Sequence, residues 1–190
     1  KYTDRIDVAQ KKTNLKDASI IAKGEIGNVT TIVFILDFSF LGGSMGAHVG
    51  ATFKIGCEKS VELKCPFISI TSSGGARMQE GIVSLMQMPK TIAAVNMLDH
   101  HKIPYISVLT HPTTGGVSAS FAMLGDIIIA EKGSMIGFAG KRVISETIRE
   151  ELPDDFQTAE YLLEHGMVDM VVHRKELNET LARVMSFVKK

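Results

Sequence analysis

Two glycine pairs constrain this chain more than any other feature of its sequence. One lies in Thr71-Ser72-Ser73-Gly74-Gly75-Ala76-Arg77, the other in Thr113-Thr114-Gly115-Gly116-Val117-Ser118. Each pair follows a short apolar run typical of a strand and precedes a stretch with helical spacing. Glycine at such a turn lets bare backbone approach a ligand, and the following helix aims its unpaired N–H groups at the same place. The two turns together are predicted to bind one oxyanion.

A purely structural role is the alternative, because a Gly-Gly pair often only makes a tight turn. Here the unit of strand, small polar residues, Gly-Gly and helix recurs after 41 positions, from Gly74 to Gly115. This repetition favours a binding site. A third glycine-rich segment, Leu41 to Gly46, is either another turn or another place where backbone meets ligand, and Ser44 is predicted to cap the helix that follows it.

Strands and helices alternate along the chain, which indicates an α/β fold with right-handed crossovers. A polar helix from Thr3 to about Lys12 is predicted to lie on the surface or on a partner. A hairpin is predicted around residues 24–28. The remaining strands are expected at 67–71, 105–109, 126–130, 135–138 and 168–172, and the remaining helices at 44–63, at about 76–101 with a division at Pro89, and at 117–124, 144–151, 158–165 and 177–188.

Length and charge limit the function classes. The 190 residues fit one domain, which buries roughly 70% of its unfolded surface. The 21 basic and 21 acidic residues cancel, so no net field attracts nucleic acid or an anionic membrane. The longest apolar runs are far too short for a membrane span. With no signal peptide at its start, the chain is expected in the cytoplasm, or in the plastid stroma of a plastid-bearing organism.

The sulfur-containing residues are predicted to be structural. Cys57 and Cys65 are eight positions apart, which suits neither a four-ligand zinc site nor a disulfide framework, so buried free thiols are expected. Methionine fills irregular gaps in cores, and a core role is favoured over a ligand surface for the four methionines of the helical segment after the first glycine pair: Met78, Met86, Met88 and Met97.

Around the glycine pairs, the segments Ser73 to Gly81, Pro112 to Ser120 and Ile136 to Gly140 resemble the carboxyltransferase β subunit of bacterial or plastid acetyl-coenzyme A carboxylase. The resemblance runs from Lys1 to about Arg174. It implies a crotonase-type (ClpP/crotonase) spiral of ββα units, here as one domain over 1–190. It also implies transfer of a carboxyl group from carboxybiotin to acetyl-coenzyme A, giving malonyl-coenzyme A in the first committed step of fatty acid synthesis.

The same resemblance implies partners and a zinc-binding segment. The partners are a carboxyltransferase α subunit in an α2β2 assembly, a biotin carboxyl carrier protein and, in the larger complex, biotin carboxylase. Family β subunits usually begin with a four-cysteine zinc ribbon, which nothing in this sequence could form, so a truncated chain is expected and zinc belongs only to the missing ribbon. Lys141 and His111 stand where many members have proline and aspartate, which leaves the edge of the substrate site in question.

The site residues follow from these motifs. A thioester enolate carries its charge on the carbonyl oxygen, and converging backbone N–H groups stabilise such an oxygen. The predicted hole uses backbone around Gly74, Gly75, Ala76, Gly115 and Gly116, and the resemblance implies that the biotin nitrogen takes the methyl proton. Arg77 contacts a coenzyme A phosphate or pairs with Glu80. Contacts with acyl-coenzyme A or biotin are further expected at Gly43, Ser44, Met45, Arg77, Thr114, Val117 and Phe138.

Two rival functions remain in view. A Clp-type serine hydrolase would use Ser118 or Ser120 as nucleophile, but it needs a histidine base, and the only histidines beyond Ser120 are His165 and His173, both at element ends. A non-catalytic crotonase-like assembly subunit would be expected to lose a glycine of one pair, and both pairs are intact.

Overall fold

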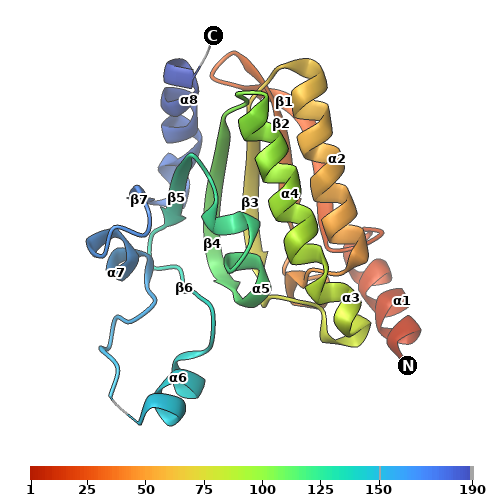
Figure 1. The fold of residues 1–190 in the computed structure, drawn as a ribbon, viewed down its shortest axis with the longest axis vertical. Coiled ribbons are helices and arrows are strands. Elements are labelled where there is room, and N and C mark those ends of the chain that lie inside the picture. The colour runs from red at the N-terminus through yellow and green to blue at the C-terminus, as the bar shows by residue number, and fades with distance from the viewer. Residues whose placement is uncertain (150, 189–190) are drawn as a thin grey trace.

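A computed structural model describes residues 1–149 and 151–188 of the chain. Its seven-stranded sheet has the order β1-β2-β3-β4-β5-β7, and β6 pairs with β4 beyond this path (Figure 1). Only the β1–β2 pair is antiparallel among the described pairs. The strands are β1 Ser19–Ile26, β2 Val29–Leu36, β3 Phe67–Ser73, β4 Tyr105–Thr114, β5 Ile127–Glu131, β6 Ile136–Gly137 and β7 Met170–Val172.

Helices separate the parallel strands, as the alternating pattern predicts. They are α1 Tyr2–Thr13, α2 Ala47–Leu63, α3 Ile82–Leu85, α4 Gln87–His100, α5 Gly115–Ser118, α6 Lys141–Ile148, α7 Ala159–Glu164 and α8 Leu177–Val188. Short 3₁₀ turns add Leu41–Gly43, Met78–Glu80, Phe121–Met123 and Arg174–Glu176. None of the helices in the described part of the chain is long and apolar enough to cross a membrane.

The sheet has an apolar core on each face because successive strand residues point to opposite sides. Phe67 and Tyr105 belong to the first core, and their neighbours Ile68 and Ile106 belong to the second. α2 and α4 lie side by side over the first face (Figure 1). There Phe53 meets Phe34, Phe67 and Phe121 with ring centroids 4.3–5.2 Å apart. The second core includes three residues of α8: Leu181, Val184 and Met185.

The predicted hairpin is present. Gly27 and Asn28 both have positive φ, 58° and 60°, as a two-residue turn between twisted strands requires. A methyl group at Gly27 would lie 2.9 Å from Ala182, so the turn packs closely against α8.

Four of the predicted helices differ from those in the structure. α2 begins at Ala47 with Gly46 as its N-cap, because Ser44 is bound elsewhere. The segment after the first glycine pair divides at Met86, and Pro89 sits in the first turn of α4, where its missing N–H costs nothing. The predicted helix 117–124 is two short pieces interrupted at Ser120, which has φ −129° and ψ −118°. The predicted helix 144–151 is instead α6, and residue 150 lies outside the described residues.

The methionine prediction is half right. Met88 and Met97 pack against the first core, but Met78 and Met86 are 87% and 58% exposed. The polar 3₁₀ turn at Met78 and the break at Met86 place these two side chains outside the sheet-facing side of α4. Both cysteines are buried free thiols, as expected.

Candidate functional site

The two glycine turns lie together at one edge of the sheet. β3 and β4 are parallel neighbours, and they pair Ser73 with Thr113 just before the turns. Gly75 has φ 108° and Gly115 has φ 60°, which favours glycine at both positions. A methyl group added at Gly75 would lie 3.1 Å from the Cα of Gly115. The fold therefore brings the two predicted turns into direct contact.

Most backbone donors of these turns are already used inside the protein. The N–H of Gly74 donates to the Gly42 carbonyl at 2.9 Å, and that of Gly75 donates to the Ser73 hydroxyl at 3.0 Å. The N–H of Gly115 donates to the Phe138 carbonyl at 3.0 Å. The expectation that Gly75 and Gly115 offer donors to a ligand is corrected, since their N–H groups hold the turns in shape.

Two donors remain. Within residues 1–149 and 151–188, the N–H groups of Ala76 and Gly116 have no acceptor. Gly116 is the second residue of α5, where no earlier helical carbonyl is available. A methyl group at Gly116 would lie 3.6 Å from the Ala76 nitrogen, so the two donors are neighbours. An oxyanion hole in this chain can be built from one N–H of each turn.

The Leu41–Gly46 segment packs against the first glycine turn and is hydrogen-bonded to its backbone. Met45 N–H donates to Gly75 O at 2.8 Å, and Arg77 N–H donates to Met45 O at 3.0 Å. Gly43 is buried with φ 61°, and a methyl group there would lie only 2.0 Å from the carbonyl oxygen of Ser72. Of the two roles left open for this segment, the structural one fits Gly43 and Met45. Gly43 and Met45, both buried, are corrected from predicted ligand contacts to supports of the turn.

Arg77 does not face a ligand. Its side chain is 0% exposed, and its Nη1 and Nη2 donate to the Asp17 carboxylate at 2.8 and 2.6 Å. Its Nε and Nη2 also donate to the hydroxyl and carbonyl of Ser44. Burial alone lowers the pKa of Arg77, but hydrogen bonds with Asp17 and Tyr2 outweigh it and raise that pKa above its ordinary value. The phosphate role is therefore wrong for Arg77, and Ser44 is its partner.

The predicted Arg77–Glu80 pair is present at 3.4 Å, within a larger network. Glu80 accepts hydrogen bonds from the Tyr2 hydroxyl and from the N–H of Ala47, both at 2.7 Å. Glu80 thus caps α2 from another element and ties α1 to the first turn. Asp17, Tyr2 and Glu80 carry this network, and the sequence reasoning assigned a partner role only to Glu80.

The side chains of the second turn are mostly structural. Val117 is completely buried, which does not support its predicted ligand contact, whereas Thr114 is half-buried and its hydroxyl donates to the carbonyl of Ser73 at 3.1 Å. Ser118 donates to the Gly137 carbonyl at 2.8 Å, and Ser120 donates to the Gly116 carbonyl at 2.6 Å. Neither hydroxyl has a histidine partner among the described residues, so the serine-hydrolase alternative has no support there.

Phe138 differs from the other predicted contacts because its side chain is 68% exposed. It lines an apolar cavity of about 240 Å³ together with Tyr161 and Phe156. Its carbonyl holds Gly115, so its backbone is tied to the second turn while its ring stays available.

Metal and thiol chemistry have no support in the described part of the chain. No group of three or more His, Cys, Asp or Glu residues there could hold a metal ion. Burial raises the pKa of the Cys57 and Cys65 thiols, which opposes the thiolate form. His111 accepts from the N–H of Met135 at 3.1 Å, and the side chain of Lys141 lies outside the described residues.

Comparison with known proteins gives matches over nearly the whole chain. The sequence model of the family described as "Carboxyl transferase domain" matches residues 3–189. The acetyl-coenzyme A carboxylase carboxyl transferase subunit beta of Bradyrhizobium diazoefficiens is 58% identical over 190 residues, 100% of this chain and 61% of that protein. The subunit of the same name from Brucella abortus (strain 2308) is 56% identical over 100% of this chain and 63% of that protein. The chain spans about three fifths of the length of these curated relatives.

Solved structures agree. Transcarboxylase 12S with hydrolysed methylmalonyl-coenzyme A superposes with a TM-score of 0.80 at 28% identity, covering 88% of this chain and 33% of that one. The Pseudomonas malonate decarboxylase MdcD-MdcE heterodimer gives 0.78 at 22% identity, covering 90% and 78%, which supports the fold alone. The predicted crotonase-type fold is confirmed.

Proposed function

Because the chain belongs to the carboxyl transferase domain family, we propose that it is the β chain of an acetyl-coenzyme A carboxylase carboxyltransferase. In this reaction a carboxyl group passes from carboxybiotin to the methyl carbon of acetyl-coenzyme A, which gives malonyl-coenzyme A. The identity of 55–58% to subunits of that name supports the assignment. The observation that carries it is the pair of free N–H groups on Ala76 and Gly116.

Those two donors suit the charge that the chemistry creates. Loss of a proton from the thioester methyl group moves negative charge to the carbonyl oxygen. Fixed N–H groups at that oxygen stabilise the enolate, each by roughly 3 to 4 kcal/mol where water is excluded. The closed hydrogen bonds of Gly74, Gly75 and Gly115 hold the two donors in place before substrate binds.

Two carboxylates near the first turn, those of Glu80 and Asp17, are already hydrogen-bonded within the protein and are not free to act as a base. Glu80 is held by Tyr2 and Ala47, and Asp17 is held by Arg77. Carboxybiotin, supplied on a carrier protein, would bring the carboxyl group and, once it is released, a basic ureido nitrogen for the methyl proton. The role of this chain is then to bind the thioester, orient its carbonyl and stabilise the enolate.

A second chain is part of the proposal. Carboxybiotin would supply a second oxygen that gains negative charge when its carboxyl group is transferred, so the reaction would need two sites that stabilise an anion. The two turns of this chain provide one hole, and an α partner of related fold would provide the other. An obligate interface of this kind buries well above roughly 2,000 Å². A biotin carboxyl carrier protein would deliver the donor.

The test uses the full-length chain with and without its α partner. Transfer of the carboxyl group from malonyl-coenzyme A to a biotin acceptor, which leaves acetyl-coenzyme A, should occur in the mixture and be absent with either chain alone. Carboxyl transfer by this chain alone, linear in its concentration and unchanged by the partner, would refute the shared site. A complex that assembles and turns over no acyl-thioester would instead favour the non-catalytic assembly subunit.

Gly116→Val tests the hole within that complex. The added side chain would start 3.6 Å from the Ala76 nitrogen and crowd the oxygen site, while its nearest neighbour is the flexible Met88 sulfur at 3.3 Å. We expect kcat to fall by about 10² to 10³ with the fold intact. Gly24→Val is the matched control, because nothing lies within 4 Å of a methyl group there. A wild-type rate in folded Gly116→Val would remove Gly116 from the hole.

A further inference from the structure

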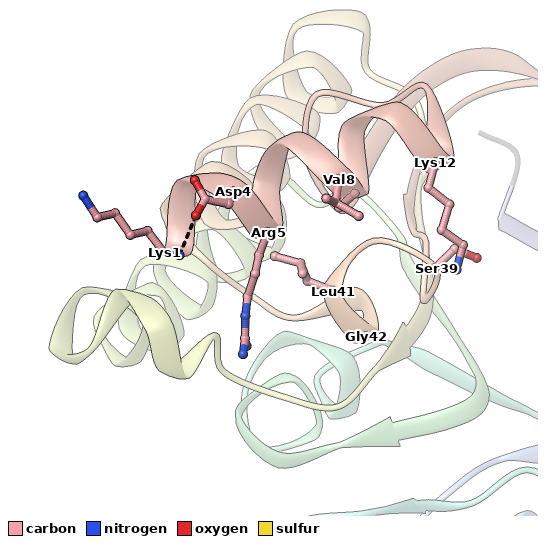
Figure 2. A pocket seen from close by; sticks show the side chains of 9 residues that line it. Lys1, Asp4, Arg5, Val8, Lys12, Ser39, Leu41 and Gly42 are labelled. Atoms are coloured by element: carbon pink, nitrogen blue, oxygen red, sulfur yellow. Dashed lines mark hydrogen bonds and ion pairs between the residues drawn. The ribbon is translucent and has the colours of Figure 1, made fainter.

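α1 and the Leu41–Gly43 turn line an open surface pocket of about 460 Å³ (Figure 2). Four lining residues of α1, namely Arg5, Val8, Ala9 and Lys12, recur at helical spacing and so share one face. Figure 2 shows Arg5 extending from α1 beside Leu41, and Lys12 reaching towards Ser39. The pocket thus has an apolar floor of Val8 and Leu41 between two cationic groups.

The charge of this pocket is not balanced by the protein. Three cationic side chains line it, those of Lys1, Arg5 and Lys12, against the single carboxylate of Asp4. In the described part of the chain neither Arg5 nor Lys12 has an ion-pair partner. Since the chain as a whole is neutral, this local excess favours an anionic ligand at this place.

The pocket adjoins the first glycine turn. Gly42 lines it, and the Gly42 carbonyl accepts the N–H of Gly74, two residues before the free donor of Ala76. A ligand that places a carbonyl at Ala76 can therefore continue into the pocket. A coenzyme A thioester has this layout, with the thioester at one end and phosphate groups at the other.

We propose that Arg5 and Lys12 of α1 bind phosphate groups of the acyl-coenzyme A substrate. This inference rests on the proposed function and names the residues that hold the nucleotide end of the thioester. It fills the role that Arg77 cannot play, since that guanidinium is buried against Asp17. Arginine and lysine are the side chains that pair with phosphate oxygens, and both remain charged at neutral pH.

The test compares Arg5→Gln and Lys12→Gln with Lys11→Gln in the full-length chain assembled with its α partner. Lys11 is exposed on the same helix but does not line the pocket, so it matches the change in charge. With acetyl-coenzyme A, KM should rise roughly five- to tenfold in each pocket variant and stay near wild type in Lys11→Gln. With acetyl-pantetheine, which lacks the nucleotide, KM should be the same in all four proteins.

An unchanged KM for acetyl-coenzyme A in both pocket variants would overturn the proposal. An equal loss with both thioesters would also overturn it, because it would show a structural effect of α1. Binding of adenosine 3′,5′-bisphosphate, measured by calorimetry, separates this inference from the proposed reaction. Weaker binding in Arg5→Gln than in Lys11→Gln supports the phosphate site even if no thioester is turned over, whereas equal binding in the two variants contradicts it.

Discussion

The buried Arg77–Asp17 pair predicts the largest stability effect among single substitutions in the site. Arg77→Met removes a guanidinium that is 0% exposed and leaves the carboxylate of Asp17, itself 8% exposed, without its two short hydrogen bonds. Breaking a buried pair in this way costs about 3 to 5 kcal/mol. The raised pKa of Arg77 keeps its guanidinium protonated in the wild-type pair.

That loss is a large share of the roughly 5 to 15 kcal/mol that stabilises a domain. At about 2 to 4 °C per kcal/mol for a chain of this length, Tm should fall by roughly 6 to 20 °C. Urea unfolding followed by circular dichroism gives the same quantity as a free energy of unfolding. Removing Asp17 as well, in Arg77→Met with Asp17→Ala, should recover part of the loss, because no buried charge is then left unpaired.

The control for Arg77→Met is Lys59→Met on α2. Lys59 pairs with Glu62 at 2.6 Å, but the two side chains are 53% and 62% exposed, so the loss should stay below about 1 kcal/mol. The reasoning is refuted if Arg77→Met unfolds at the same urea concentration as Lys59→Met, or if the double variant is less stable than Arg77→Met alone.

Two further predictions concern other parts of the sheet edge. Gly43→Ala should lower the free energy of unfolding by about 1 to 3 kcal/mol more than Gly133→Ala does. Both positions have positive φ, but only at Gly43 would the methyl group lie 2.0 Å from the Ser72 carbonyl oxygen. An equal fall in Tm in the two variants would contradict the close approach. Glu131 accepts hydrogen bonds from Arg174, and these lower the pKa of the Glu131 carboxyl. The pair therefore stabilises the fold fully above the ordinary glutamate pKa of about 4.3. This stabilisation is lost as the pH falls through the lower pKa of the folded state. Glu131→Gln should thus be less stable than wild type by under about 1 kcal/mol at pH 7 and closer to it near pH 3.5, and a gap that widens in acid would argue against the pair.

Turn residues and the spacing of apolar residues predicted much of the fold. The Gly27-Asn28 turn, the end of α2 near Leu63 and the whole of α8 follow from turn residues and apolar spacing, which act over a few positions. The break at Ser120 does not follow from such spacing. The residues 117–124 are small or apolar enough for a continuous helix, yet α5 ends at Ser118, whose hydroxyl donates to the carbonyl of Gly137, 19 positions away.

The candidate site could be located from the sequence but not completed. The glycine pairs mark the two turns, yet which N–H groups are free depends on distant acceptors such as Gly42 O and Phe138 O. The role of Arg77 depends on Asp17, 60 positions away, and the sequence around Arg77 does not predict that pairing. The positive charges of α1 were visible, but only the fold shows that Arg5 and Lys12 face a pocket beside the first turn.

The packing of α8 on the second face of the sheet has a consequence for the order of assembly. Strands β3, β4 and β5 are synthesised before α8, and they share a core with it through Ile68, Ile106, Val108 and Ile129. During translation the face that they form has no cover until the last described element leaves the ribosome. A nascent chain of this kind exposes an unshielded β surface until α8 has been synthesised, and during that time the surface is open to chaperones and to aggregation.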